Sequence, residues 1–348
     1  MRTAVLAAAL VAGLAIGAPV DAATPDGLDD GSDAAALEAL DRAVVAAQRV
    51  PHRGEVTVVS FSAEGPQVTT VALRRTAEGD LEVRRLRGVE VGDAADAALR
   101  PTRTGALLRL GGVERANFDR DRFLAAYRVV HGGAADVDTG PATRLEVSRR
   151  ATGALREVLF VDDATGLLVR RETFDPDGLP VRLVAFTELS HDPDVVAPPP
   201  EIPRASPAAA ALELDGRFPG LLPGGFELLD LRELEDTEVP VTRLVYDDGL
   251  YTLSLFVQDG RLDPKATDGA SAMRTPTGGT VWRWPGSEPR RVVWSGDGRT
   301  FTALSDAPTA DVVAAVADLP NAPPPSTLER LTRGLSRVWK QLLPPWGD

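Results

Sequence analysis

The stretch Glu55-Val56-Thr57-Val58-Val59-Ser60-Phe61 decides the fold class, because β-branched and aromatic residues at this density favour a β-strand. Two runs that follow, Gln67–Arg75 and Asp80–Arg87, alternate apolar and polar residues, which is the period of a strand with one buried face. The segments between them, Ala63-Glu64-Gly65-Pro66 and Ala77-Glu78-Gly79-Asp80, have the composition of turns. The three runs therefore predict consecutive antiparallel strands.

One helix is predicted before these strands. Ser32 or Asp33 can cap its N-terminus, apolar residues recur at helical spacing as far as about Val50, and Pro51 ends it. After the strands, a less regular stretch from about Gly88 to Arg122 is expected to hold loops and short helices. The early helix is therefore the element around which a sheet could wrap.

Further strands are predicted downstream, separated by turn sequences such as Asp162–Gly166 and Asp175–Gly178, and Gly132-Gly133 is also interpreted as a turn. The predicted strands are Tyr127–His131, Thr143–Arg149, Leu155–Val161, Leu167–Phe174 and Leu179–Leu189. One helix and many antiparallel strands indicate a mainly β fold of the α+β type, with an unclosed antiparallel barrel wrapped on the helix. Parallel α/β folds are excluded because strand–helix alternation is missing.

The composition changes sharply between Asp192 and Pro207, where six prolines indicate a stiff, extended linker. A second, smaller antiparallel sheet is predicted after it, closed by a helix from Thr309 to about Leu319. Its predicted strands are Gly225–Glu233, Val241–Tyr246, Tyr251–Gln258, Thr280–Trp284, Arg291–Ser295 and Thr300–Ser305. The expected organisation is an export signal at 1–22, a first domain at 23–192, a linker at 193–208, a second domain at 209–322 and a separate helix at 326–343.

The first residues predict export. Met1-Arg2 supplies a positive start, Ala4–Ile16 is an apolar run shorter than the ~20 residues of a membrane-spanning helix, and Val20-Asp21-Ala22 offers small residues to a signal peptidase. A retained N-terminal anchor is the alternative. The chain contains no Cys, which excludes disulfides, Cys-ligated zinc and a lipid-acylated cysteine. We expect a soluble protein in the periplasm or on the outer face of the cytoplasmic membrane.

Composition and motifs argue against catalysis, a metal and a cofactor. The net charge of −13 excludes a nucleic-acid partner, which requires a basic face. The three histidines, His52, His131 and His191, have no metal-ligand spacing and are expected in surface or loop positions. Among the acidic pairs, Asp162-Asp163 and Asp247-Asp248 lie between strands and near Gly, where Asp is favoured for turn geometry. We therefore predict that the protein is not an enzyme.

Two stretches resemble the sigma-E regulatory family RseB, also called MucB. Leu222-Pro223-Gly224-Gly225-Phe226 and the later run Leu244–Val257, which contains Tyr-Asp-Asp-Gly-Leu, are similar to one family signature, with Asp247 where Ser is usual. Leu167–Phe174 and Val184–Leu189 are similar to the end of the family's first domain. The order and spacing of these motifs, with the proline linker between them, carry the resemblance.

The resemblance implies a first domain like that of the lipoprotein carrier LolA, joined to an RseB-type second domain. It also implies binding to the extracytoplasmic part of a membrane anti-sigma factor, control of that factor's proteolysis in a stress response, and release by a lipid. The residues expected on one apolar face, as candidates for a lipid cavity, are Val56, Val58, Val71, Leu73, Leu81 and Val83. The same face could equally be a filled core. The alternative function is a lipid or lipoprotein carrier of LolA type.

The C-terminal segment Ser326–Leu343 is predicted to be an amphipathic helix, with a capping box at Ser326 and Glu329. Its apolar side would include Leu331, Leu335, Trp339 and Leu342. Four basic residues less Glu329 give it a net charge of +3, which argues against a transmembrane role. Two interpretations stay open: the helix docks on the protein itself or on a second copy, or it lies on an anionic membrane. This basic helix and the acidity of the chain depart from the family pattern.

Overall fold

The computed structural model describes residues 33–62, 65–76, 81–87, 118–191, 218–234, 240–284 and 290–321. The chain divides into two compact units. Unit 1 comprises Met1–Arg204 together with two short segments, Asp248–Tyr251 and Gly286–Glu288, and unit 2 comprises the remaining residues. Unit 1 therefore includes seven residues that come from far beyond the predicted linker in the sequence.

Unit 1 begins with helix α2 (Ala34–Arg49). Of the two predicted caps, Asp33 fills the role: its side chain accepts a hydrogen bond of 3.0 Å from the Ala35 amide. The helix ends at Arg49 with Val50 as its C-cap, directly before Pro51, as predicted. It buries a stripe of small residues and one leucine: Ala36, Ala39, Leu40, Ala43, Ala46 and Ala47. Small side chains let the helix approach the sheet closely.

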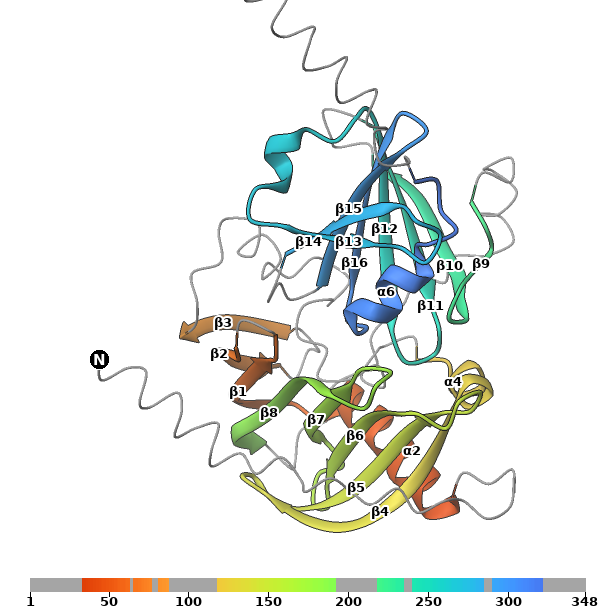
Figure 1. Ribbon diagram of the computed structural model, residues 1–348. Coiled ribbons are helices and arrows are strands. Elements are labelled where there is room, and N and C mark those ends of the chain that lie inside the picture. Colours follow the sequence, from red (N-terminus) through yellow and green to blue (C-terminus); the bar gives the residue numbers. More distant parts are fainter. Residues whose placement is uncertain are drawn as a thin grey trace, which may run out of the picture. The chain divides into compact units, whose positions relative to one another are not determined.

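The sheet of unit 1 has eight antiparallel strands in the order β3-β2-β1-β8-β7-β6-β5-β4 (Figure 1). The strands are β1 (His52–Ser60), β2 (Gln67–Arg75), β3 (Leu81–Arg87), β4 (Tyr127–Val137), β5 (Gly140–Arg149), β6 (Leu155–Asp162), β7 (Leu168–Phe174) and β8 (Pro180–His191). A short helix, α4 (Arg120–Ala126), leads into β4, and α2 contacts β4 and β6. Within the described residues β3 and β4 are edges that do not pair with each other, so the predicted unclosed antiparallel sheet with a helix is confirmed.

One turn prediction in unit 1 is wrong. Gly132-Gly133 does not end a strand, because β4 continues through both glycines to Val137. The register of β4 against β5 shifts between His131 and Ala134, which marks a β-bulge. Gly133 has a φ of 94°, a value that glycine adopts readily, and this conformation absorbs the extra residue inside the strand.

The sheet of unit 2 also has eight antiparallel strands, in the order β13-β14-β15-β16-β12-β11-β10-β9. The strands are β9 (Leu221–Leu222), β10 (Phe226–Leu234), β11 (Val241–Asp247), β12 (Thr252–Asp259), β13 (Ser271–Arg274), β14 (Thr280–Arg283), β15 (Arg290–Gly296) and β16 (Arg299–Ser305). The edge strands β9 and β13 and the 3-10 turn at Pro264–Thr267 were not predicted, because they are too short to show a periodic pattern.

The core of unit 2 lies between its sheet and helix α6 (Thr309–Ala315), which ends four residues before the predicted Leu319. The helix buries Val312 and Val313. The Trp294 ring stacks on Phe301 with centroids 5.2 Å apart, and its Nε1 donates to the Pro320 carbonyl at 3.0 Å. The second sheet thus has its own buried core.

Several predicted features lie outside the described residues. They are the export signal at 1–22, the linker at 193–208, the helix Ser326–Leu343 with Leu331, Leu335, Trp339 and Leu342, and the side chains of Leu81 and Val83. Within the part of the chain that the structure describes, no helix is long and apolar enough to cross a bilayer.

Candidate binding site

The face of the first sheet that α2 approaches is the candidate binding site, and we call it the inner face. The register places Val56 beside Val71 on one neighbouring strand and beside Phe186 on the other, and Val58 beside Val184. Directly paired residues share a face. Arg75, two residues beyond Leu73 on this face, donates from Nη2 to the Gln48 carbonyl of α2 at 3.0 Å. The helix and these apolar side chains therefore lie on the same side of the sheet.

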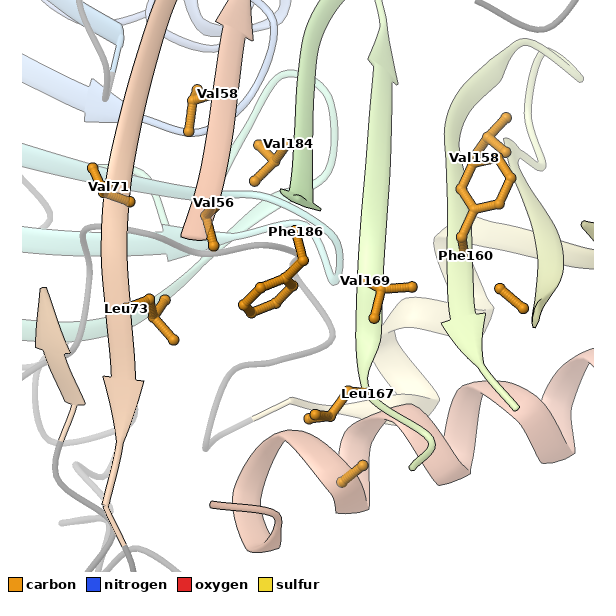
Figure 2. Packing of buried hydrophobic residues seen from close by; sticks show 12 residues of the cluster. Val56, Val58, Val71, Leu73, Val158, Phe160, Leu167, Val169, Val184 and Phe186 are labelled. Atoms are coloured by element: carbon orange, nitrogen blue, oxygen red, sulfur yellow. The ribbon is translucent and has the colours of Figure 1, made fainter. Parts of the chain in front are cut away.

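Four of the six residues predicted to share an apolar face are buried there, namely Val56, Val58, Val71 and Leu73 (Figure 2). They belong to a cluster of buried side chains whose other members are Ala46, Ala142, Val158, Phe160, Leu167, Val169, Val184 and Phe186. Leu81 and Val83 are the backbone partners of Arg75 and Leu73, and their side chains are outside the described residues. The lipid cavity on this face stays a prediction.

One end of the inner face is polar. A row of directly paired residues runs across four strands, from Ser60 on β1 to Arg182 on β8, Thr173 on β7 and Glu157 on β6. All four are buried, at 6% relative exposure or less. Burying polar groups costs free energy unless they are hydrogen-bonded. The hydrogen bonds of this polar row therefore determine how much its burial destabilises the sheet.

The central contact of the polar row is an ion pair between Glu157 and Arg171. Arg171 donates from Nε to Glu157 Oε2 at 2.5 Å and from Nη2 to Oε1, and Thr173 Oγ1 donates to Oε1 at 3.4 Å. Both charged side chains are almost completely inaccessible to solvent. A bidentate arrangement of this kind is the geometry in which a buried pair can offset its desolvation.

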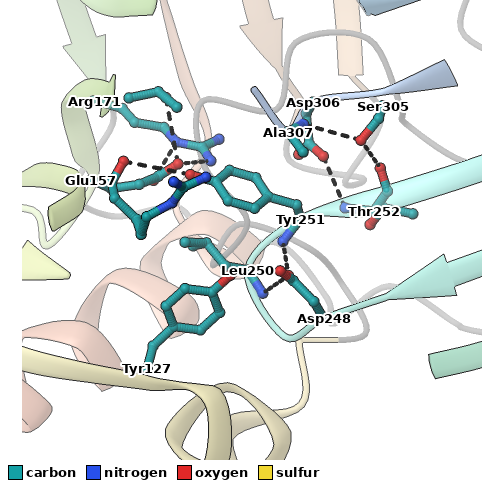
Figure 3. A network of polar contacts seen from close by, with 12 residues as sticks. Tyr127, Glu157, Arg171, Asp248, Leu250, Tyr251, Thr252, Ser305, Asp306 and Ala307 are labelled. Atoms are coloured by element: carbon teal, nitrogen blue, oxygen red, sulfur yellow. Dashed lines mark hydrogen bonds and ion pairs between the residues drawn. The ribbon is translucent and has the colours of Figure 1, made fainter. Parts of the chain in front are cut away.

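The segment Asp248–Tyr251 completes this end of unit 1. Tyr251 is fully buried, the Arg171 guanidinium lies 5.8 Å from its ring centroid, and its hydroxyl donates to the Arg156 carbonyl at 3.5 Å. Leu250 is also fully buried. The segment therefore contributes an aromatic and an aliphatic side chain beside the Glu157–Arg171 pair (Figure 3).

Asp248 connects the segment to two residues of β4 and β5. The Tyr127 hydroxyl donates to Asp248 Oδ2 at 2.6 Å, and Arg149 Nη2 donates to the same oxygen at 2.7 Å and to the Tyr127 hydroxyl at 2.7 Å. Asp248 Oδ1 accepts from the amides of Leu250 at 3.0 Å and Tyr251 at 2.7 Å. Both carboxylate oxygens thus have donors, which is what a buried carboxylate requires.

Gly249 is required by this geometry. Its φ is 95°, and a Cβ at this position would lie 2.7 Å from Phe123 Cα in α4. A side chain would therefore be strained by the backbone conformation and would also collide with main-chain atoms. The Asp-Gly step lets the segment turn tightly against α4.

Burial controls the protonation of the tyrosines in the network. Burial raises the pKa of Tyr127 well above its usual value, and the neighbouring Asp248 carboxylate adds to the rise. Burial likewise raises the pKa of Tyr251, with a smaller contribution from Glu157. Both hydroxyls are therefore protonated donors at neutral pH, and the network has the properties of a fixed structural element.

The histidine and acidic-pair predictions have mixed outcomes. The predicted surface or loop position of His52 is wrong, because His52 lies within β1. It is half-buried against Phe186, with the two ring centroids 5.7 Å apart, and burial lowers its pKa. His131 and His191 lie in strands but are exposed.

Asp162 accepts from the Thr165 amide at 2.7 Å, which is the predicted turn role. No group of three metal-ligating side chains occurs in the described ranges.

Asp247-Asp248 shows what the sequence interpretation missed. Asp247 is the last residue of β11 and Asp248 begins the turn to β12, but both residues are buried. Asp247 accepts from the Thr252 hydroxyl at 3.0 Å in unit 2, whereas Asp248 binds Tyr127 and Arg149 in unit 1. The sequence did contain one signal of this burial. The residues that flank the acidic pair, Tyr246 on one side and Leu250-Tyr251 on the other, are more apolar than those usually found around an exposed turn.

No family model and no curated protein matches the chain. Among solved structures, one of MucB in complex with MucA(peri) aligns with 82% of this chain and 99% of its own, at 18% identity and a TM-score of 0.45. The MucA/MucB complex of Pseudomonas aeruginosa aligns with 83% of this chain and 99% of its own, at 20% identity and a TM-score of 0.43. A LolA superfamily protein from Nitrosomonas europaea covers 78% of this chain and 90% of its own, at 9% identity and a TM-score of 0.19. The predicted resemblance is confirmed to this extent: solved structures of MucB are among those that align with the chain.

Proposed function

We propose that the protein is an exported regulatory binding protein of RseB type. One observation carries the proposal: the family-like sequence Tyr-Asp-Asp-Gly-Leu-Tyr, from Tyr246 to Tyr251, is buried along its whole length, and its last four residues belong to unit 1. The motif is thus an integral part of the structure, as a family signature should be. Its order relative to the other motifs, quoted above, supports the same function.

The proposed partner is the extracytoplasmic part of a membrane anti-sigma factor, whose proteolysis the protein would control. The solved MucB structures are described as complexes with MucA(peri) and with MucA, and the motif resemblance brings that kind of partner to this chain. The site described above consists of apolar side chains and of buried polar side chains such as Glu157 and Asp248, which are hydrogen-bonded and ion-paired. This composition favours binding over catalysis.

The experiment measures binding between the mature protein and the extracytoplasmic segment of a single-span anti-sigma factor encoded beside an extracytoplasmic sigma factor in the same genome. Calorimetry should give a saturable complex, and the bound segment should resist the protease that degrades it alone. A well-folded protein that neither binds nor protects the segment contradicts the proposal. Neighbouring lipoprotein-export genes would instead favour the alternative of a LolA-type carrier.

A lipid ligand is the second part of the proposal, and the buried apolar side chains of the inner face, among them Val56, Val71 and Phe186, support it. Purified protein should then carry acyl chains detectable by mass spectrometry or take up a fluorescent fatty acid. Val71→Trp, which fills the cluster, should reduce uptake, whereas Val45→Trp on the exposed side of α2 should not. Absence of both bound acyl chains and uptake would exclude the lipid, leaving partner binding intact.

Peripheral membrane contact through Ser326–Leu343 is the third part, supported by the segment's sequence pattern. Sedimentation with anionic vesicles should recover the full chain but not a chain ending at Pro325. Equal recovery of both chains, or of neither, would leave docking on the protein or on a second copy as the role of this segment.

A further inference from the structure

Three basic side chains form one row across β2, β1 and β8, and we call it the basic row. Arg75, His52 and His191 are direct cross-strand partners in that order, so they lie on the same face of the sheet. Arginine carries its charge at every physiological pH, whereas histidine gains or loses its proton between about pH 5 and pH 8. Acid therefore adds positive charge directly beside a fixed positive charge.

His52, at the centre of the row, connects it to the end of helix α2 and to the inner face. Its Nδ1 lies 2.8 Å from the Val50 carbonyl, and because a carbonyl oxygen only accepts, Nδ1 carries the proton of the neutral ring. The His52 ring also meets the Phe186 ring edge-on, with the ring planes at 79°. Phe186 belongs to the buried apolar cluster (Figure 2), so a change at His52 acts directly on the inner face.

Gly54 makes the contact between the two rings possible. It lies on the same face of β1, between the basic row and the row that contains Phe186. A Cβ at Gly54 would lie 3.0 Å from Phe186 Cδ1 and 2.0 Å from the Glu188 carbonyl oxygen. The register of β1 against β8 shifts in the residues that follow Gly54. This end of the sheet is therefore closely packed but held by an irregular ladder of hydrogen bonds.

The described charged groups that share this end of the face with His52 are basic. The nearest acidic residues of β1 and β8, Glu55 and Glu188, are partners of each other and lie on the opposite face, because successive strand residues alternate. Arg49, in the last turn of α2, is exposed and also basic. Burial lowers the pKa of His52, and the charges of Arg75 and His191 lower it further, against the opposite effect of the Val50 hydrogen bond.

We propose that the basic row is an acid-sensitive joint at one end of the inner face. A neutral His52 holds β1, β8 and the end of α2 together through its contacts with Val50 and Phe186. In acid His52 gains a proton, and its positive charge then lies beside that of Arg75, which opposes the pairing of the strands. The joint opens, and water reaches Phe186 and the apolar side chains beyond it.

The direction of the effect follows from the lowered pKa of His52. Because this pKa lies below the ordinary value of 6.5, the stability from the neutral ring is fully present above about pH 6.5. It is lost as the pH falls through the pKa of the native protein. The inference adds an acid response to the proposed function and does not depend on it, because the protein alone shows the response.

The test is amide hydrogen exchange of the purified protein at about pH 7.5 and at about pH 5, corrected for the intrinsic effect of pH on exchange. Protection at residues 52–56 of β1 and 186–191 of β8 should fall about fivefold in acid, because like charges directly opposite each other destabilise a sheet. The strands of unit 2 should keep their protection. His52→Gln, which cannot gain a proton, should abolish the fall.

Two further variants make the test specific. His191→Gln removes one of the basic neighbours at an exposed position, so it should fold and should reduce the fall in protection even if His52→Gln is unstable. His131→Gln is the matched control, because His131 is also an exposed strand histidine but its partner is the uncharged Leu145. This control should keep the wild-type response in β1 and β8.

Three results would overturn the inference. Protection in β1 and β8 could be unchanged by acid, which would show that the joint does not open. It could fall equally in His52→Gln and in wild-type protein, which would assign the response to other groups. Units 1 and 2 could lose protection together, which would indicate general acid unfolding. A fall confined to β1 and β8 that disappears with His52→Gln supports the joint.

Discussion

The Tyr127 hydroxyl donates a hydrogen bond of 2.6 Å to Asp248 Oδ2, although the two residues are 121 positions apart in the chain. Arg149 donates to both of them, so the three side chains form a closed triangle of polar contacts. The triangle fixes the only part of the Tyr246–Tyr251 motif that belongs to unit 1. Its energetics are therefore the most direct measure of how the motif contributes to the fold.

Tyr127→Phe should lower the free energy of unfolding of unit 1 by about 1–3 kcal/mol, because the buried Asp248 loses one of its donors. Tyr251→Phe is the matched control: its hydroxyl donates at 3.5 Å to a carbonyl, so its loss should cost less. Hydrogen exchange of β4 to β7 reports on unit 1. Within the described residues, the tryptophans Trp282, Trp284 and Trp294 all belong to unit 2, so their fluorescence reports on unit 2. Equal effects of the two substitutions would contradict the role assigned to Tyr127.

Titration of the tyrosines tests the burial of the network directly. The chain has three tyrosines, and burial raises the pKa of each of them, Tyr246 included. The native protein should therefore show no tyrosinate absorbance near pH 10, where about half of the tyrosine side chains of the unfolded chain are ionised.

The same shifts predict a loss of stability in alkali. Above about pH 10 the unfolded state binds fewer protons than the native state, so the free energy of unfolding must fall as the pH rises. This stability is fully present below the unfolded pKa. Urea unfolding between neutral pH and about pH 11 measures the slope, and Tyr127→Phe should reduce it. A native protein whose tyrosines titrate near pH 10 would show that the network is open to solvent.

The alternating pattern of β1 and β2 was sufficient to predict the inner face. Val56 and Val71 are direct partners on that face because successive strand residues point to opposite sides, a rule that depends on local sequence alone. The open antiparallel sheet and the cap at Asp33 followed from equally local signals.

The contact between Tyr127 and Asp248 could not be predicted in this way. A hydrogen bond between distant residues depends on how the strands are ordered, and no periodicity reports that order. The turn prediction at Gly132-Gly133 failed for a related reason. A glycine pair can form either a turn or a bulge within a strand, and only the pairing of β4 with β5 distinguishes the two.

The buried pair of Glu157 and Arg171 should be costly to break. Glu157→Gln removes the charge and leaves the Arg171 guanidinium without its bidentate carboxylate, which should destabilise unit 1 by about 3–5 kcal/mol. Asp41→Asn breaks the exposed ion pair with Arg120 in the same unit and should cost less than about 1 kcal/mol. The double variant Glu157→Gln/Arg171→Met should recover part of the loss, because the Arg171 guanidinium no longer has to be buried without a carboxylate. Urea unfolding, followed by hydrogen exchange of β6 and β7, measures the stability of all three variants. If the double variant is no more stable than Glu157→Gln, the uncompensated charge of Arg171 is not what destabilises the single variant.

Gly249→Ala should detach the Asp248–Tyr251 segment from its place in unit 1. The substitution places a Cβ 2.7 Å from Phe123 Cα, at a residue whose φ is 95°, so the backbone must move. We expect a loss of ~3 kcal/mol and faster amide exchange at Leu250 and Tyr251, whose N–H groups donate to Asp248 Oδ1. Gly153→Ala is the matched control, because Gly153 also has a positive φ, 71°, but no atom lies within 4 Å of its Cβ position. That control should lose only ~1 kcal/mol. Fast exchange confined to the Gly249 variant would establish that the close approach to α4, and not the backbone conformation alone, holds the motif in unit 1. Similar losses in both variants would assign the effect to the positive φ.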